Sequence, residues 1–313
     1  MGTTKKSKNQ KIIKKQVNKA IKRIPLGIVI CILIVGCIVG YLYYKKINDN
    51  KDSTNENNIK GNVAYLVQEG TTVDDVKITF LELFGTNGNP QIGDSVFIEC
   101  GDIDILIDAG EKASGSNTVV PFIEEHVSDN ILELVIVTHA DSDHLGGMVG
   151  LSNSYGALEV PGITYQYIVD FGYEGQTQLY KDYLEVRNKK IKEGTKYFSI
   201  GSIFDSDHLE AITRFYLGVD TYLDLLDYKT YEISEITDDN DRSVSCLLTH
   251  NDKKVLLCGD AEKKEEAYLT SLNIGHVDVF KANHHGSPTS NTNAFLDNIT
   301  PNYVIICSSE ENK

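Results

Sequence analysis

A short segment at residues 138–147, which follows a run of apolar residues, carries the strongest chemical signal in the sequence. It places four groups that could bind a metal within six residues: His139, Asp141, Asp143 and His144. Imidazoles and carboxylates at this density suit zinc or manganese better than calcium. Glycines at positions 146 and 147 let the backbone turn tightly beneath these groups. The alternative is an acidic loop with two incidental histidines, which the preceding apolar strand disfavours.

Two further motifs place polar side chains at strand ends. Asp260 follows the apolar run 254–258 and a glycine, so that one carboxylate lies at the rim of a sheet, where it could bridge two metal ions. A helix N-cap is the ordinary alternative for this residue. His284 and His285 follow another apolar strand, and paired histidines there are seldom core packing, because each buried ring needs a hydrogen-bond partner. We therefore expect the three motifs to converge on one metal centre.

The order of these motifs resembles that of the metallo-β-lactamase superfamily of metal-dependent hydrolases. The H-x-D-x-D-H form, with Asp141 in place of the second histidine, is similar to the branch that includes the nuclease-like domain of ComEC-type DNA-uptake channels. Residues 240–245 and 284–287 match the N…S…L stretch and the HHGS motif of that branch. Residues 93–95 and 107–110 resemble its early G-D-S/A and L-I-D-x-G motifs.

The resemblance implies two divalent metal ions, Zn²⁺ or Mn²⁺. His139 and Asp141 would hold one ion, and Asp143 and His144 would hold the other. Asp260 would bridge the two ions, and a bridging water with a lowered pKa would be the nucleophile. Catalysis would therefore depend most directly on Asp143 and Asp260.

One of His284 and His285 would complete the shell of ligands, and strand register favours His284 because it lies nearer the strand end. Asp94 and Asp108 are interpreted as orienting residues or turn formers. The middle histidine ligand of the superfamily has no clear counterpart in this chain. Its absence is a departure from the pattern that the other motifs follow.

Short apolar runs alternate with turn residues from Val63 onward, which indicates an α/β fold. Strands are expected at 132–138 and 254–258, among others, and an amphipathic helix at 177–192. Connections through both hairpins and helices favour sheets covered by helices, and the resemblance implies an αββα four-layer metallo-β-lactamase sandwich. Residues 63–313 are long enough for one core. Relatives continue beyond the point where this chain stops, so truncation at Lys313 stays open.

The N-terminal part differs in composition from this domain. Residues 1–23 form a basic tail with nine Lys and Arg, and residues 24–44 contain no charged residue. As a helix, residues 24–44 would reach roughly 31 Å, about one hydrocarbon thickness. With a polar linker at 45–62, this predicts a single transmembrane anchor that contacts the bilayer, a cytoplasmic N-terminus and an extracellular hydrolase domain. A lipoprotein modified at Cys37 is the alternative.

The charge distribution limits the kinds of substrate and macromolecule that the protein can bind. The chain has a formal charge of −15, and residues 45–313 alone carry 45 acidic and 21 basic groups. The net negative charge of residues 45–313 repels phosphate, which disfavours tight binding of duplex nucleic acid. A membrane-tethered hydrolase of a small or short phosphodiester is the first hypothesis. A lactonase or β-lactamase-like hydrolase and a non-catalytic surface binding module are the alternatives, and no feature of the sequence defines an oligomeric state.

The predicted topology is tested with protease added to intact cells. The protease should remove residues 62–313 and leave the first 23 residues protected, because the nine cations before the span keep the N-terminus inside. Immunoblotting with tags at either end measures both outcomes. Protection of the C-terminal body would contradict the orientation.

Overall fold

The structure, a computed structural model, describes residues 62–200, 212–226 and 237–309. The predicted basic tail, the membrane segment at 24–44 and all of the linker except Asn62 lie outside the described residues. No helix in the described part of the chain is both long and apolar enough to cross a bilayer.

The described strands form two mixed sheets. The larger sheet has seven described strands in the order β1 (Asn62–Tyr65), β8 (Ile212–Gly218), β9 (Thr221–Leu225), β10 (Cys246–His250), β11 (Lys253–Leu257), β12 (Val279–Lys281) and β13 (Tyr303–Ile305). The smaller has six in the order β2 (Lys77–Phe80), β3 (Val96–Cys100), β4 (Ile103–Ile107), β5 (Ile131–Val137), β6 (Thr164–Asp170) and β7 (Lys196–Ser199). The α/β class predicted from the sequence is confirmed.

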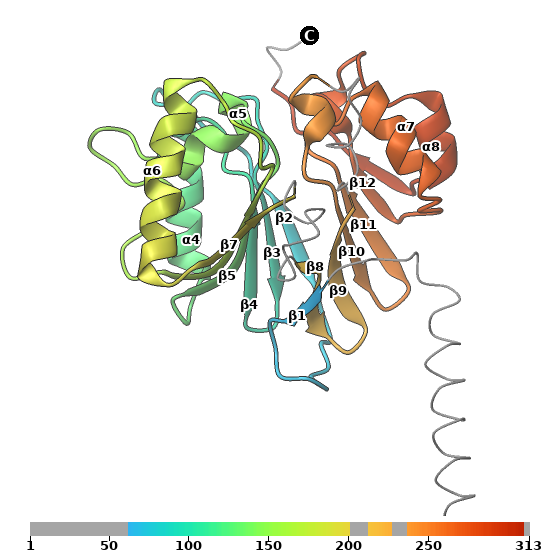
Figure 1. Cartoon of the computed structure of the whole chain (residues 1–313), viewed down its shortest axis with the longest axis horizontal. Helices are drawn as coiled ribbons and strands as arrows, with labels where there is room; N and C mark the ends of the chain where they lie inside the picture. The colour runs from blue at the N-terminus through green and yellow to red at the C-terminus, as the bar shows by residue number, and fades with distance from the viewer. Residues whose placement is uncertain (1–61, 201–211, 227–236, 310–313) are drawn as a thin grey trace, which may run out of the picture. The chain divides into compact units, whose positions relative to one another are not determined.

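The two sheets face one another, and helices cover their outer faces (Figure 1). Helices α4 (Val120–His126) and α6 (Gln178–Glu193) lie outside the smaller sheet, and α7 (Lys263–Ser271) and α8 (Asn293–Ile299) lie outside the larger. This order of layers fits the sandwich that the resemblance implies. The helix expected at 177–192 is α6, which begins after Thr177, whose side chain accepts a hydrogen bond from the Tyr180 amide, and ends at Gly194 with a φ of 112°.

Aromatic side chains join the two sheets. Phe215 of β8 meets Tyr167 of β6 edge-on, with 5.4 Å between ring centroids, and stacks with Phe198 of β7 at 6.2 Å. Phe215 is fully buried, so its ring contributes apolar burial to the core between the sheets.

Four strand ends converge at one rim of the sandwich. Strands β4 and β5 pair in parallel in the smaller sheet, and β11 and β12 pair in parallel in the larger. The carboxyl ends of parallel strands lie at the same edge of a sheet. The segments that follow these four strands therefore bring Asp108, His139, Asp260 and the paired histidines to the same rim.

A close backbone approach supports the first of these segments. Gly147 donates its amide to the Gly110 carbonyl at 2.6 Å, which joins the segment after β5 to the segment after β4. A Cβ at Gly147 would lie 2.0 Å from the Ala109 carbonyl oxygen, a distance that no side chain tolerates. The absence of a side chain at this glycine therefore lets the two segments pack together.

Gly147→Ala should destabilise the fold by about 1–3 kcal/mol, the usual cost of overpacking. The midpoint of urea unfolding measures this loss. Gly85→Ala is a matched control, because a Cβ there meets only the exposed side chain of Gln91, at 3.0 Å, which can move aside. Equal midpoints for the two variants would contradict the role given to Gly147.

Candidate metal centre

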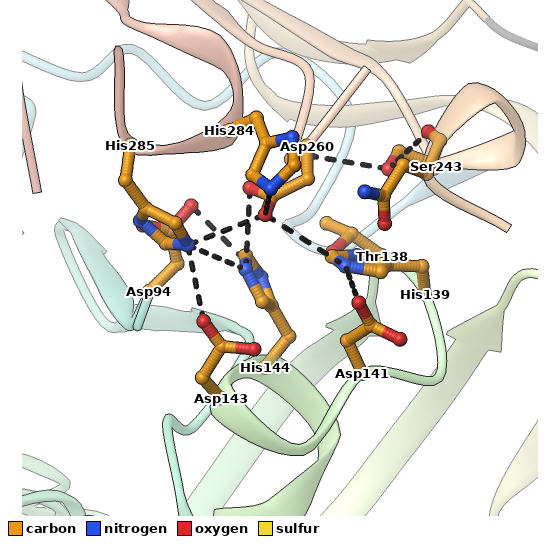
Figure 2. A network of polar contacts seen from close by, with 12 residues as sticks. Asp94, Thr138, His139, Asp141, Asp143, His144, Ser243, Asp260, His284 and His285 are labelled. Carbon is orange, nitrogen blue, oxygen red and sulfur yellow. Dashed lines mark hydrogen bonds and ion pairs between the residues drawn. The ribbon is translucent and has the colours of Figure 1, made fainter. Parts of the chain in front are cut away.

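Imidazoles and carboxylates from both sheets meet at the rim (Figure 2). His139 is fully buried and follows β5, and His144 is fully buried in the short helix α5 (Ser142–Leu145). Asp260 is 2% exposed and follows β11. His284 and His285 follow β12. The structure therefore brings together the three sequence motifs that were expected to converge.

One group of donor atoms has the spacing of a metal shell. His285 Nε2 lies 3.2 Å from Asp143 Oδ2, 3.2 Å from Asp260 Oδ2 and 3.3 Å from His144 Nε2. His144 Nε2 lies 3.2 Å from Asp260 Oδ1. Ligands at 2.0–2.1 Å from a tetrahedral ion are about 3.3 Å apart. His144, Asp260 and His285 therefore fit one divalent cation, and Asp143 lies beside His285.

A second group surrounds the other face of Asp260. His139 Nε2 lies 3.9 Å from Asp141 Oδ2 and 4.0 Å from Asp260 Oδ2. His284 Nε2 lies 3.9 Å from the same oxygen of Asp260. Two ligands of one ion are at most about 4.2 Å apart. His139 Nε2 is also buried and has no hydrogen-bond partner among the described residues, so a cation would satisfy it.

The remaining ring nitrogens are held as metal-binding imidazoles usually are. The Nδ1 atom of His144 lies 2.8 Å from Asp108 Oδ2, and that of His285 lies 2.8 Å from the Cys307 carbonyl oxygen. His284 Nδ1 lies 3.2 Å from Glu262 Oε1. Each contact turns the Nε2 atom of the ring toward the centre. Glu262 was not identified from the sequence.

The backbone directs both paired histidines inward. His284 and His285 have φ values of 48° and 52°, in the left-handed region that residues other than glycine seldom adopt. An extended strand would point successive side chains to opposite faces, which is why register favoured His284 alone. The two left-handed residues instead place both rings around Asp260 (Figure 2), and His285 rather than His284 lies beside Asp143.

Asp108 orients the segment after β5. Its carboxylate accepts hydrogen bonds from the Thr138 amide at 2.8 Å and the Thr138 hydroxyl at 2.6 Å, in addition to its contact with His144. Ser243, in the stretch that matches the N…S…L motif, plays a similar part for Asp260, because its hydroxyl lies 3.2 Å from the Asp260 amide. These contacts fix the ligand-bearing backbone before any ion binds.

Asp94 lies closer to the centre than the sequence indicated. It is 3% exposed, and with His144, Asp260 and His285 it forms a tight group of potential ligand atoms. Its nearest ring atoms, however, are the Nδ1 atoms of His144 at 3.9 Å and His285 at 3.5 Å, which already contact Asp108 and a carbonyl. Asp94 therefore faces ring nitrogens that already have partners, whereas Asp143 faces the Nε2 atom of His285.

The electrostatics favour the ligand form of His139 and Asp260, but in the absence of a cation they favour the protonated form of His144 and His285. Burial, with the neighbouring His144, lowers the pKa of His139, so this ring is neutral at neutral pH. Burial raises the pKa of Asp260, but His144 and Lys281 outweigh it and hold that pKa well below its usual range. Burial lowers the pKa of His285, whereas Asp143 and Asp260 raise it to about 9. Binding of a cation would therefore displace a proton from His285.

Comparisons with known proteins agree with the resemblance. No family model matches the chain. Recombination protein 2 of Haemophilus influenzae is 25% identical over 214 residues, which cover 66% of this chain and 22% of that protein. Competence protein ComA of Neisseria gonorrhoeae is 25% identical over 224 residues, which cover 70% of this chain and 26% of that protein. The match thus spans about a quarter of the length of these curated relatives.

A solved structure is also similar. The metallo-β-lactamase fold protein YhfI from Bacillus subtilis is 14% identical, with a TM-score of 0.40, and the match covers 67% of this chain and 72% of that one. The two curated relatives confirm the predicted resemblance to ComEC-type competence proteins.

Asp108→Asn should weaken metal binding by about 10–100-fold, the usual effect of removing an orienting partner. The variant keeps the shape of the side chain but loses the charge that holds His144 and Thr138. Calorimetric titration of the metal-free chain with Mn²⁺ measures the affinity. Asp224→Asn, which alters a buried ion pair with Arg214 between β8 and β9, should leave the affinity unchanged. Equal affinities for the wild type and Asp108→Asn would contradict the orienting role.

Proposed function

We propose that this protein is a metal-dependent hydrolase whose centre holds two divalent cations, Zn²⁺ or Mn²⁺, and cleaves phosphodiester bonds. The observation that carries the proposal is the convergence of two groups of donor atoms on the carboxylate of Asp260, with His144 at 3.2 Å from Oδ1 and the other three imidazoles within 4.0 Å of Oδ2. One group is His144, His285 and Asp143, and the other is His139, Asp141 and His284. In this assignment each of the paired histidines serves a different ion, and His284 replaces the missing middle histidine.

Two divalent cations held at the rim would supply Lewis acidity toward the scissile group and a water nucleophile at neutral pH. The residues of this chain would position the two cations. Asp260 presents Oδ1 to His144 and Oδ2 to His139, so one carboxylate sets the spacing of the two sites. Asp108 and Glu262 hold their imidazoles in fixed orientations, so little reorganisation is needed when substrate binds.

The substrate class rests on the relatives and on charge. The names of the relatives associate them with recombination and competence, which are processes that involve DNA. This association favours a phosphodiester substrate over a lactone or a β-lactam. The net charge of residues 45–313 repels long polyanions, which favours a small or short substrate. We further propose that residues 24–44 anchor the chain in the membrane with this domain outside.

The proposal is tested with the full chain loaded with Mn²⁺ or Zn²⁺. Bis-p-nitrophenyl phosphate and short single-stranded DNA should be hydrolysed, whereas duplex DNA, a lactone and a cephalosporin should react slowly or not at all. Asp260→Ala should lower turnover of bis-p-nitrophenyl phosphate about 100-fold or more, because both ions lose a ligand.

Two further variants sharpen the result. Asp143→Asn should lose activity and recover part of it in excess metal, because it weakens one ligand of one ion. His276→Ala is the control, since this exposed histidine contacts only Thr300 and Asn302 among the described residues and should leave turnover unchanged. Preferential hydrolysis of the lactone or the cephalosporin would replace the phosphodiesterase proposal, and metal binding without any turnover would favour a binding module.

A further inference from the structure

A lysine is buried within the centre. Lys281 is the last residue of β12 and is only 1% exposed. Complete burial of a cationic side chain is costly unless the charge is paired and hydrogen-bonded. Lysine beside a cation site adds a repulsive charge, so its presence there calls for a specific physical role.

The contacts of Lys281 lead to Asp260. Its ammonium donates to the Gly259 carbonyl at 2.9 Å, forms an ion pair with Asp94, and lies 3.4 Å from Asp260 Oδ1. Of the two carboxylate oxygens of Asp260, Lys281 contacts only Oδ1. Oδ2 faces His139, His284 and His285.

Lys281 keeps its positive charge within the centre. Burial lowers the pKa of Lys281, but the carboxylates of Asp94 and Asp260 raise it above the ordinary value. Lys281 therefore offsets part of the negative charge that the buried carboxylates of Asp94 and Asp260 bring to the centre.

We propose that Lys281 is a positioning residue, which fixes Asp260 Oδ1 so that the carboxylate bridges two ions instead of rotating to serve one. The inference rests on the proposed two-ion centre. The backbone amide of Asp260 is tied to Ser243, which holds the main chain but not the carboxylate. His144 and His285 contact the carboxylate, but both are proposed metal ligands whose Nε2 atoms would turn to the ions. Lys281 adds a contact to Oδ1 from a residue that is not itself a proposed ligand, and Asp94 supplies the buried counter-charge that the lysine needs.

The test titrates the metal-free full chain with Mn²⁺ and measures stoichiometry and thermal stability. The wild type should bind two ions, and Asp94→Asn is measured beside it as the single-variant reference for the double variant below. Lys281→Met should bind one ion as the wild type does and the other at least about tenfold more weakly. It should also melt lower, since Asp94 is left as an unpaired buried carboxylate.

The double variant, Asp94→Asn with Lys281→Met, separates positioning from stability. It should regain the melting temperature, because no buried charge is left unpaired, but not the second ion. Recovery of both would show that Lys281 acts only as the counter-ion of Asp94, and would overturn the proposal. Two ions bound by Lys281→Met with wild-type affinities would overturn it as well.

A matched control and the wild type complete the design. Arg214→Met removes the cation of another buried ion pair, with Asp224, and should lower the melting temperature while two ions still bind. A wild type that binds two ions but hydrolyses none of the substrates defeats the proposed function and leaves this inference standing. A wild type that binds fewer than two ions defeats both.

Discussion

The arrangement at the rim depends on the position of one buried carboxylate among four imidazoles. The oxygens of Asp260 lie 3.2 to 4.0 Å from the Nε2 atoms of His139, His144, His284 and His285. Two of these rings follow a strand of the smaller sheet and two follow a strand of the larger. The aromatic contacts of Phe215 between the sheets therefore matter for the centre, because they join the two sheets that carry its halves.

Such a concentration of carboxylates is unfavourable without cations. Asp94, Asp108 and Asp260 are each at most 3% exposed, so their mutual repulsion is screened little by water. Lys281 and the imidazoles offset part of this repulsion, and divalent cations would offset the remainder. Metal binding and folding should therefore be coupled, and loss of metal should loosen the rim before it affects the core.

The sequence predicted the fold class and the strands that carry the ligands, because β5 and β11 end in the apolar runs 134–137 and 255–258, which polar residues and glycine follow. It did not predict β8, whose apolar pattern is interrupted by a buried Arg214. That residue is satisfied by Asp224 of β9, 2.6 Å away, and such pairing across strands depends on the tertiary structure. The helix α8 was also missed.

The candidate site was predicted from residue types, and its finer geometry was not. Register favoured His284 because it assumed an extended backbone, whereas the left-handed turn brings in His285 as well. Asp94 was interpreted as an orienting residue or a turn former, and Lys281 was interpreted only as the end of an apolar strand. Their proximity arises from contact between the two sheets, which periodicity along one segment does not reveal.

The central claim is that two cations share Asp260. Anomalous diffraction from crystals of the full chain soaked in Mn²⁺ tests it most directly. The account predicts two anomalous peaks on either side of Asp260, about 3.5–4 Å apart, one beside His285 and the other beside His139. A single peak at the rim, or peaks that do not adjoin Asp260, would contradict it.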